Sequence, residues 1–459
     1  MNQLPLTSLA QSSSVMGQAA AVEPQTYRAY TLRNYRSIPQ IAALPPEWQE
    51  AIEVVGRILP FKTNSYVVEE LIDWSSVPDD PIFVLNFPQP GMLRPEHYER
   101  VREALRRHGP ESAELERVVR EVRLELNPHP AGQMEHNVPD LYGERLPGMQ
   151  HKYRETVLFF PSNGQTCHAY CTFCFRWPQF VGDQSLKFAM REAGKLVEYL
   201  RAHPEVTDVL FTGGDPLVMT TRNLRAYVQP LLDADLPGLR TIRIGTKSLA
   251  YWPYRFLTDR DADDLLALFR EIVESGYHLA VMAHFNHPRE LSTPAVEEAI
   301  ARVRATGAEI RTQSPIMRNI NDDAAVWARM WRRQVQLGCI PYYMFVARDT
   351  GAQHYFAVPL VRAWEIFREA YANVSGIART VRGPSMSTDP GKVQVLGPVE
   401  VNGEKLLALQ FLQGRNPEWV MRPFFAEYDE GAAWLDDLRP AFGAREFFFE
   451  EEMRRRFGA

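Results

Sequence analysis

Residues 162–177, SNGQTCHAYCTFCFRW, contain Cys167, Cys171 and Cys174, three of the four cysteines in the chain of 459 residues. Thiolates held this close together on one loop are good ligands for zinc or for an iron–sulfur cluster. A structural zinc site usually has four protein ligands, and His168 or a distant residue would have to complete it. On a four-iron cluster, three cysteines instead leave one iron open to a reacting molecule.

The cysteine segment follows the first of six short apolar runs that alternate with amphipathic helical stretches. The runs are TVLFF (156–160), VTDVLFTGG (206–214), TIRIGTKS (241–248), HLAVMAHF (278–285), AEIRTQSP (308–315) and IPYYMFVA (340–347). Six strand–helix units in sequence predict a parallel sheet with right-handed connections. Because a closed barrel has eight units, we predict an open, partial (βα)6 barrel. Its chemistry is expected beyond the C-terminal ends of the strands, where the cysteines lie.

The two flanking regions have different patterns. The first is mostly helical, since segments such as RPEHYERVREALRRHG carry apolar residues at three- and four-residue spacing. After residue 380, the segment KVQVLGPVEVNGEKLLALQF predicts a hairpin turned at Asn402 and Gly403. The predicted fold class is therefore α/β, with a helical N-terminal region (26–150), the partial barrel (151–380) and a small α+β C-terminal domain (381–459).

The totals are those of a globular protein with 45% hydrophobic and 24% charged residues. The net charge of −6 gives no reason to expect nucleic acid or an anionic membrane as a partner. No apolar run approaches the roughly 20 residues of a membrane helix. Residues 1–25 lack the pattern of a secretory signal and predict a disordered tail. The remaining cysteine, Cys339, is expected to be a core thiol, so no disulfide framework is indicated and the cytoplasm is the expected compartment.

The cysteine spacing, with an aromatic residue (Phe173) before the last cysteine, resembles that of the radical S-adenosylmethionine enzymes. The resemblance implies that S-adenosylmethionine chelates the open iron of a [4Fe-4S] cluster. An electron from the cluster then cleaves it to methionine and a 5′-deoxyadenosyl radical, which abstracts hydrogen from a substrate. The segment LFTGGDPL resembles the glycine-rich segment near the methionine amino group. There Gly213 and Gly214 would let the backbone approach the cofactor closely, with Asp215 following.

Further segments narrow the resemblance to the lysine 2,3-aminomutase family, over well more than half of the chain. They include NPHPAGQ, LPGMQHKYRETVLFF, IRIGTKS, HFNHPREL, RTQSPIMRNIND and DPGKVQVL. Members of this family are isomerases that move an amino group between adjacent carbons while pyridoxal 5′-phosphate holds it as an imine. The resemblance therefore implies three cofactors, an amino acid substrate, an electron donor such as flavodoxin or ferredoxin, and a homo-oligomer.

Two residues match the catalytic residues of that family. Lys392, in STDPGKVQV, matches the lysine that forms the resting Schiff base, although only Gly391 stands where the family has a longer glycine run. The alternative is a surface lysine in a turn. Arg176 matches the arginine that pairs with the substrate α-carboxylate, for which a planar guanidinium is well suited.

Other matches concern the cofactors. Gln313 matches a glutamine on the coenzyme side. His284, Asn286 and His287 follow the fourth strand, where they would contact S-adenosylmethionine or would satisfy each other and the backbone.

The family also has two arginines near the coenzyme phosphate. Here Lys152 and Tyr153 fit that segment, Thr156 stands at the second basic position, and Arg154 offers a charge nearby. Trp177 also replaces a basic residue of the family.

The positions that would determine the substrate depart from the lysine-specific pattern of two aspartates. Counting along the chain reaches Arg348 and Ser385, and a slip of one or a few residues reaches Asp349 and Asp389. A cation and a hydroxyl would repel an ammonium group and suit an anionic side chain. Both a lysine-like and a glutamate-like amino acid remain candidate substrates.

Two alternative functions remain open from the sequence. One is a radical S-adenosylmethionine enzyme without pyridoxal phosphate that catalyses another hydrogen abstraction, and the state of Lys392 separates it from an aminomutase. The other is a non-catalytic binding protein in which the cysteine loop is held together by zinc. Iron and acid-labile sulfide in protein prepared without oxygen would exclude it.

Overall fold

The computed structural model describes residues 23–126, 136–181 and 188–457, so the NPHPAGQ segment and most of the predicted tail lie outside the described residues. The helices are α1 (Pro46–Ile58), α2 (Pro81–Asn86), α3 (Pro95–His108), α4 (Ala113–Glu125), α5 (Ala193–Ala202), α6 (Thr221–Asp233), α7 (Ser248–Tyr251), α8 (Ala262–Glu274), α9 (Pro294–Arg304), α10 (Ala324–Gln336), α11 (Gln353–Phe356), α12 (Leu360–Ala372) and α13 (Glu450–Phe457). The strands are β1 (Ala29–Thr31), β2 (Lys62–Asn64), β3 (Asp140–Leu141), β4 (Glu144–Arg145), β5 (Met149–Tyr153), β6 (Thr156–Phe159), β7 (Asp208–Phe211), β8 (Thr241–Thr246), β9 (His278–His284), β10 (Glu309–Ile316), β11 (Ile340–Val346), β12 (Arg382–Ser387), β13 (Gly391–Val401), β14 (Glu404–Gly414) and β15 (Pro423–Glu427).

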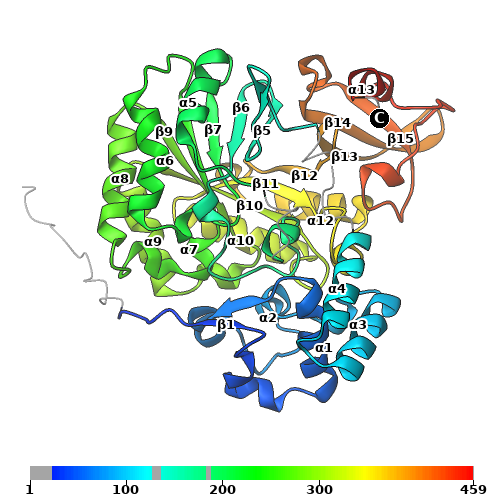
Figure 1. The fold of residues 1–459 in the computed structure, drawn as a ribbon. Coiled ribbons are helices and arrows are strands. Elements are labelled where there is room, and N and C mark those ends of the chain that lie inside the picture. The colour runs from blue at the N-terminus through cyan, green and yellow to red at the C-terminus, as the bar shows by residue number, and fades with distance from the viewer. Residues whose placement is uncertain (1–22, 127–135, 182–187, 458–459) are drawn as a thin grey trace, which may run out of the picture.

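One mixed sheet of 11 strands organises the molecule (Figure 1), in the order β15-β14-β13-β12-β11-β10-β9-β8-β7-β6-β5. Strands β6 to β12 run parallel to one another. Strand β5 at one edge and strands β13 to β15 at the other are antiparallel additions. The two edge strands do not pair with each other, so the sheet is open. All six predicted strand–helix units are confirmed, while the curvature of a partial barrel stays a prediction.

A further parallel strand, β12, was not expected. Its sequence, RGPSMS, contains glycine, proline and two serines in place of an apolar run. Such residues are depleted in strands, so this segment has no strand signal in the sequence. It pairs with β11 on one side and with β13 on the other, where Ser387 lies opposite Lys392.

The N-terminal region is helical, as predicted, and lies below the sheet in the view of Figure 1. Helices α3 and α4 contact each other and α1. The side chain of Ser112 accepts a hydrogen bond from the Leu115 N–H and so caps α4. No helix among residues 23–126, 136–181 and 188–457 is long and apolar enough to cross a membrane.

The C-terminal hairpin of β13 and β14 is confirmed. Its turn residues, Asn402 and Gly403, have φ values of 52° and 83°, as a two-residue turn of this kind requires. The hairpin extends the main sheet and packs on a separate buried cluster that includes Val393, Phe411 and Trp419. The predicted division of the chain into domains stays a prediction.

The parallel strands bring distant segments to one edge of the sheet. The cysteine segment follows β6, Gly213 and Gly214 follow β7, Lys247 follows β8, and β9 ends at His284. Because the strands are parallel, all of these residues lie at the carboxyl edge, where ligands bind in sheets of this class.

Candidate active site

The three cysteines of the segment after β6 are neighbours. Each is half-buried, and burial followed by the nearby Cys171 raises the pKa of the Cys174 thiol to about 12. Burial and then Asp215, Cys174 and Cys171 raise the pKa of Cys167. Among the described residues, no group of three or more His, Cys, Asp or Glu side chains is arranged so that it could hold a metal ion. The set nevertheless has the donor chemistry of a three-cysteine cluster site.

Within residues 23–126, 136–181 and 188–457, no fourth ligand for zinc accompanies the cysteines. His168 Nδ1 lies 3.0 Å from Ser248 Oγ, and burial lowers the pKa of this imidazole to about 3. Cys339 lies between α10 and β11 and is only 3% exposed, as expected for a core thiol. Burial, partly offset by Arg304, raises the pKa of Cys339 to about 12, and no cysteine of the loop contributes to this shift.

The helical N-terminal region holds the cysteine segment through its backbone. Lys62 Nζ donates to the Cys167 carbonyl at 2.7 Å, and the Lys62 carbonyl accepts from the Tyr170 N–H at 2.8 Å. Thr172 donates through its hydroxyl to the Val84 carbonyl at 2.7 Å. Sequence reasoning missed this role, because no local spacing connects β2 or α2 with the cysteines.

The glycines after β7 pack against the start of the cysteine segment. Gly213 has a φ of 140°, which favours glycine. A Cβ on Gly214 would lie 2.5 Å from the Thr166 nitrogen, and the Asp215 N–H donates to the Thr166 carbonyl at 2.7 Å. The glycines therefore allow a close approach between two backbone segments of the chain, which was not predicted from the sequence. Contact of these glycines with S-adenosylmethionine stays a prediction.

Asp215 is buried, and its carboxylate is fully occupied by protein donors. It accepts from the Lys247 N–H at 2.8 Å, from Thr246 Oγ1 at 2.8 Å and from Ser248 Oγ at 3.0 Å. These bonds connect the segment after β7 to the end of β8. The geometry makes Asp215 a positioning residue, and its predicted contact with a cofactor stays a prediction.

A second buried network connects the ends of β8, β9 and β10. Lys247 Nζ lies 2.6 Å from Glu290 Oε1 and 2.7 Å from Asn286 Oδ1. The Asn286 amide in turn donates to Ser314 Oγ at 2.8 Å. Glu290 is 0% exposed, so the Lys247 ammonium is the counter-charge that makes its burial tolerable.

The histidines and the glutamine predicted near this edge also have protein partners. Gln313 Nε2 lies 2.8 Å from His284 Nε2. Burial, aided by the nearby Lys247, lowers the pKa of His284 to about 3, so its neutral ring accepts this hydrogen bond. His287 Nδ1 accepts from the Arg289 N–H at 3.2 Å. The three side chains predicted to follow the fourth strand therefore bond other protein groups and, within the described structure, not one another, and their contact with a cofactor stays a prediction.

Lys392, on β13, has the properties of a reactive amine. Its Nζ donates to Gln413 Oε1 at 3.1 Å and lies 4.1 Å from the centre of the Tyr343 ring. Burial, followed by the charges of Arg382 and Arg243, lowers the pKa of Lys392 to about 7. A large fraction of this amine is neutral near pH 7, and the neutral amine is the nucleophile toward an aldehyde. The alternative of a surface lysine in a turn is wrong.

Lys152 lies in a cluster of cations that includes Lys392, and its Nζ is 5.6 Å from the centre of the Tyr153 ring. Lys152 donates to the Thr388 carbonyl, and burial, followed by Arg415 and Arg348, lowers its pKa well below the usual value. Arg415 was not identified as a site residue from the sequence, because no motif near the end of β14 points to it. Its Nη2 lies 2.6 Å from Asp389 Oδ1.

The two substitutes considered for the second basic position are not part of this cluster. Arg154 is exposed at the turn between β5 and β6. Thr156 donates through its hydroxyl to Asp208 Oδ2 at 3.1 Å. The cation that accompanies Lys152 is instead Arg415, which the fold brings from the far end of the chain.

Arg176 and Arg348 have buried nitrogen atoms without hydrogen-bond partners. These are Arg176 Nη1 and Arg348 Nε and Nη2, and no described residue accepts from them. The Phe175 ring centre lies 5.2 Å from the Arg176 guanidinium and 4.9 Å from that of Arg348. Burial, with a smaller effect of Arg348, lowers the pKa of Arg176 to about 10. Unpaired buried donors are costly, so the pair is arranged to receive anions.

The remaining positions of the predicted substrate end differ from one another. Ser385 is fully buried, and its hydroxyl lies 3.5 Å from the Met344 carbonyl. Asp389 is paired with Arg415, whereas Asp349 is half-buried beside Arg348 and has an unpartnered Oδ1 within the described structure. Trp177 donates to Thr350 Oγ1 at 3.2 Å and so joins the segments after β6 and β11.

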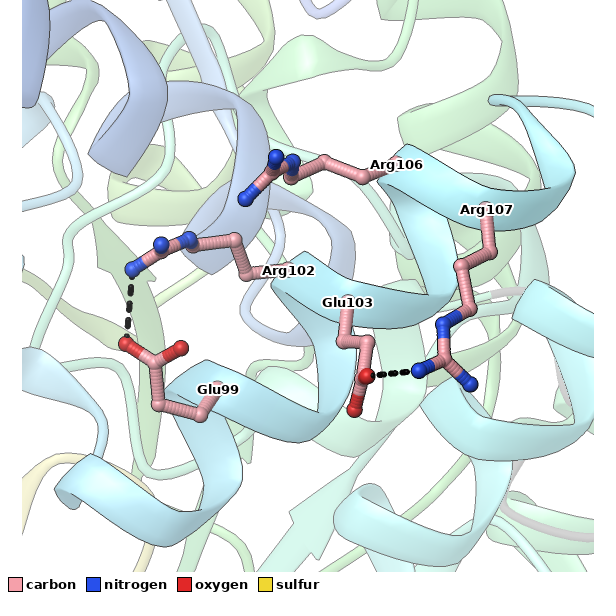
Figure 2. A pocket seen from close by; sticks show the side chains of 5 residues that line it. All are labelled: Glu99, Arg102, Glu103, Arg106 and Arg107. Carbon is pink, nitrogen blue, oxygen red and sulfur yellow. Dashed lines mark hydrogen bonds and ion pairs between the residues drawn. The ribbon is translucent and has the colours of Figure 1, made fainter.

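A separate hollow lies on the outer surface of α3 (Figure 2). It is lined by Glu99, Arg102, Glu103, Arg106 and Arg107. Arg102 Nη1 lies 2.8 Å from Glu99 Oε1, and Arg107 Nη2 lies 2.5 Å from Glu103 Oε1. Within each of these surface pairs the two charges satisfy each other. The hollow contains none of the site residues described above.

The sequence of this chain is similar to those of several known proteins. A protein of Aquifex aeolicus named "Putative L-lysine 2,3-aminomutase" is 31% identical over 397 residues, which are 86% of this chain and 92% of that protein. The L-lysine 2,3-aminomutase of Fusobacterium nucleatum is 29% identical over 234 residues, 51% of each chain. That of Escherichia coli is 29% identical over 250 residues, 53% of this chain and 68% of the relative. No family model matches the chain.

Among solved structures, a radical SAM methyltransferase from Sphaerobacter thermophilus covers 52% of this chain and 68% of its own. Its TM-score is 0.36 and its sequence identity 16%. That likeness is too distant to bear on the chemistry of the site.

Proposed function

Since the chain belongs to the lysine 2,3-aminomutase family of radical S-adenosylmethionine enzymes, we propose that it is an isomerase that moves the α-amino group of an amino acid to the β-carbon. S-adenosylmethionine on a [4Fe-4S] cluster supplies the radical, and pyridoxal phosphate supplies the electron sink for the migrating nitrogen. A one-electron donor of the flavodoxin or ferredoxin type, a cytoplasmic location and a homo-oligomer belong to the same proposal.

The observation that supports this proposal most strongly is the environment of Lys392. A lysine whose pKa is lowered to about 7 by burial and by Arg382 and Arg243 is a nucleophile near neutral pH. The Tyr343 ring, 4.1 Å from its Nζ, provides an aromatic surface beside the amine. An exposed lysine would keep a pKa near 10.4 and would be protonated almost completely.

The surrounding cations fit the anionic groups of a coenzyme and a substrate. Lys152, which donates to the Thr388 carbonyl, and Arg415, which donates to the Asp389 carbonyl, are proposed to hold the coenzyme phosphate. Arg176, with a buried unpartnered Nη1, is proposed to bind the substrate α-carboxylate. Lys152 lies on β5 and Arg415 directly follows β14, so the sheet positions the two donors proposed for the phosphate.

We further propose that the substrate has an anionic side chain. Arg348 offers two buried nitrogens, Nε and Nη2, that have no partner among the described residues, and it lies close enough to Arg176 to lower that residue's pKa. An ammonium group at this place would add a third cation to two that already repel each other. A carboxylate would satisfy the unpartnered donors, because a guanidinium binds it in a planar, two-point geometry.

The test is a product assay on anaerobically reconstituted protein supplied with glutamate, aspartate or lysine, each carrying ¹⁵N at the α-amino group. We expect a β-amino product from an acidic amino acid and none from lysine. Arg348→Gln should reduce kcat/KM for the acid by about 100-fold, as loss of one partner of a buried charge pair costs several kcal/mol. The exposed Arg154→Gln is the control and should leave the rate unchanged. Preferential turnover of lysine would refute the anionic substrate.

A further inference from the structure

A buried phenol lies against one of the three cluster cysteines. Tyr251 is the last residue of α7, the short helix after β8, and is 1% exposed. Its hydroxyl oxygen lies 3.6 Å from Cys171 Sγ, within hydrogen-bond distance for sulfur. Neither the spacing of the cysteines nor the strand pattern indicates this contact, because 80 residues separate the two positions.

The phenol is held in place from several sides. Asn86 Nδ2 donates to the Tyr251 hydroxyl at 3.4 Å, and Asn64 Nδ2 donates to the Tyr251 carbonyl at 2.9 Å. Lys247 Nζ lies 4.2 Å from the centre of the ring. Because the hydroxyl oxygen accepts from Asn86, its own hydrogen remains available for a different acceptor.

Binding of iron fixes the direction of the contact. A cysteine that ligates a cluster is a thiolate, which has no hydrogen and acts only as an acceptor. A tyrosine phenol, whose ordinary pKa is about 10, keeps its hydrogen near neutral pH. The one arrangement consistent with both groups is a hydrogen bond from the Tyr251 hydroxyl to the Cys171 sulfur.

We propose that Tyr251 is a positioning residue that donates this hydrogen bond and thereby raises the reduction potential of the cluster. Hydrogen bonds to cluster sulfurs are among the features by which proteins set such potentials. Reduction adds one electron to the cluster and breaks no bond to it, and the added negative charge strengthens the hydrogen bond. The reduced state is therefore stabilised relative to the oxidised state. This inference rests on the cluster and on no property of pyridoxal phosphate or the substrate.

The test is a redox titration of full-length protein reconstituted anaerobically with iron and sulfide, without S-adenosylmethionine. Dithionite in the presence of mediators supplies the electron, and electron paramagnetic resonance measures the reduced cluster. Tyr251→Phe removes the hydroxyl and keeps the ring. We expect the ratio of reduced to oxidised cluster at a fixed potential to fall about tenfold, equivalent to about 59 mV for one electron.

Tyr66→Phe is the matched control. Tyr66 is equally buried, and its hydroxyl forms a hydrogen bond of 2.7 Å with Thr293 Oγ1 in place of a cysteine. The Tyr66→Phe substitution should leave the reduction potential of the cluster unchanged. An unchanged potential in Tyr251→Phe, with iron content equal to the wild type, would overturn the inference while leaving the proposed function intact. Absence of iron from the wild-type protein would refute the proposed function itself.

A second variant covers the case in which Tyr251→Phe does not retain its cluster. Asn86→Leu keeps the phenol and removes the amide that donates to it at 3.4 Å. Without that donation the phenol is a weaker donor, because hydrogen bonds in a chain strengthen one another. The potential should fall in the same direction by a smaller amount, and a potential equal to that of the wild type would overturn the inference.

Discussion

The two sides of the candidate site differ in how their charges are satisfied. At the ends of β7, β8 and β9, the buried charges of Asp215, Lys247 and Glu290 all have protein partners between 2.6 and 3.0 Å away. On the side built by β11 to β14 and the segment after Cys174, Arg176 and Arg348 have buried nitrogens without partners in the described chain. The charges of the first side are satisfied as folded, whereas we propose that those of the second side are satisfied when anions bind.

We infer from this difference that the residues of the first side position the site, whereas those of the second side bind ligands. A satisfied network fixes the backbone on which a cofactor rests, and its loss should first lower the stability of the fold. Unsatisfied cations reduce the stability of the free protein, and that cost is recovered on binding. Substitutions on the two sides should therefore change the free energy of unfolding in opposite directions.

The largest effect is expected for Lys247→Met. The substitution leaves Glu290, which is 0% exposed, without its counter-charge. The free energy of unfolding of the apoprotein should fall by about 3–5 kcal/mol, measured by urea denaturation. Lys195→Met is the control, because its partner Glu144 is 63% exposed, and it should cost less than about 1 kcal/mol. Equal losses in the two variants would contradict the account of the first side.

A smaller loss is expected for Gly214→Ala. The added Cβ would lie 2.5 Å from the Thr166 nitrogen, so the cysteine segment must shift. Unfolding free energy should fall by about 1–3 kcal/mol, with a lower iron content after reconstitution. Gly194→Ala, in α5, has no atom within 4 Å of its Cβ and should stabilise the helix by about 0.5–1 kcal/mol. Full iron loading of Gly214→Ala would show that this close packing is unimportant.

On the other side, Arg348→Met should stabilise the apoprotein by about 1 kcal/mol, because it removes a buried cation with unpaired donors. The control is Arg255→Met, since Arg255 is an arginine that is 3% exposed, whereas Arg348 is half-buried. Its guanidinium bonds Asp261 Oδ1 at 3.0 Å and the Leu217 carbonyl at 2.8 Å. The control should destabilise by about 3 kcal/mol or more. Destabilisation by both would mean that Arg348 has a structural role.

Much of the fold could be predicted because the central strands are apolar runs. Strands buried on both faces, such as β9 with HLAVMAH, are nearly continuous hydrophobic segments that are visible without any partner. Strand β12 could not be predicted, because its glycine, proline and serines are placed in the sheet by the strands on both sides. Tertiary pairing overrode local preference there.

The candidate site shows the same division. The three cysteines and the glycine pair could be recognised because each group lies within a few residues of sequence. The lowered pKa of Lys392 could not, since it depends on burial and then on Arg382 and Arg243, which the sheet brings from β12 and β8. The contact of Asn86 with Tyr251 likewise spans 165 residues.

The central claim is that Lys392 is a neutral, reactive amine within a cationic site. The most direct measurement is borohydride reduction of anaerobically purified protein in the presence of pyridoxal phosphate, followed by peptide mass mapping across a range of pH. Because the pKa of Lys392 is lowered to about 7, its neutral fraction increases as the pH rises through that value. We predict a pyridoxyl adduct on Lys392 whose yield is half-maximal near pH 7. A loaded cluster with Lys392 unmodified at every pH would contradict amino-group migration and favour another radical reaction.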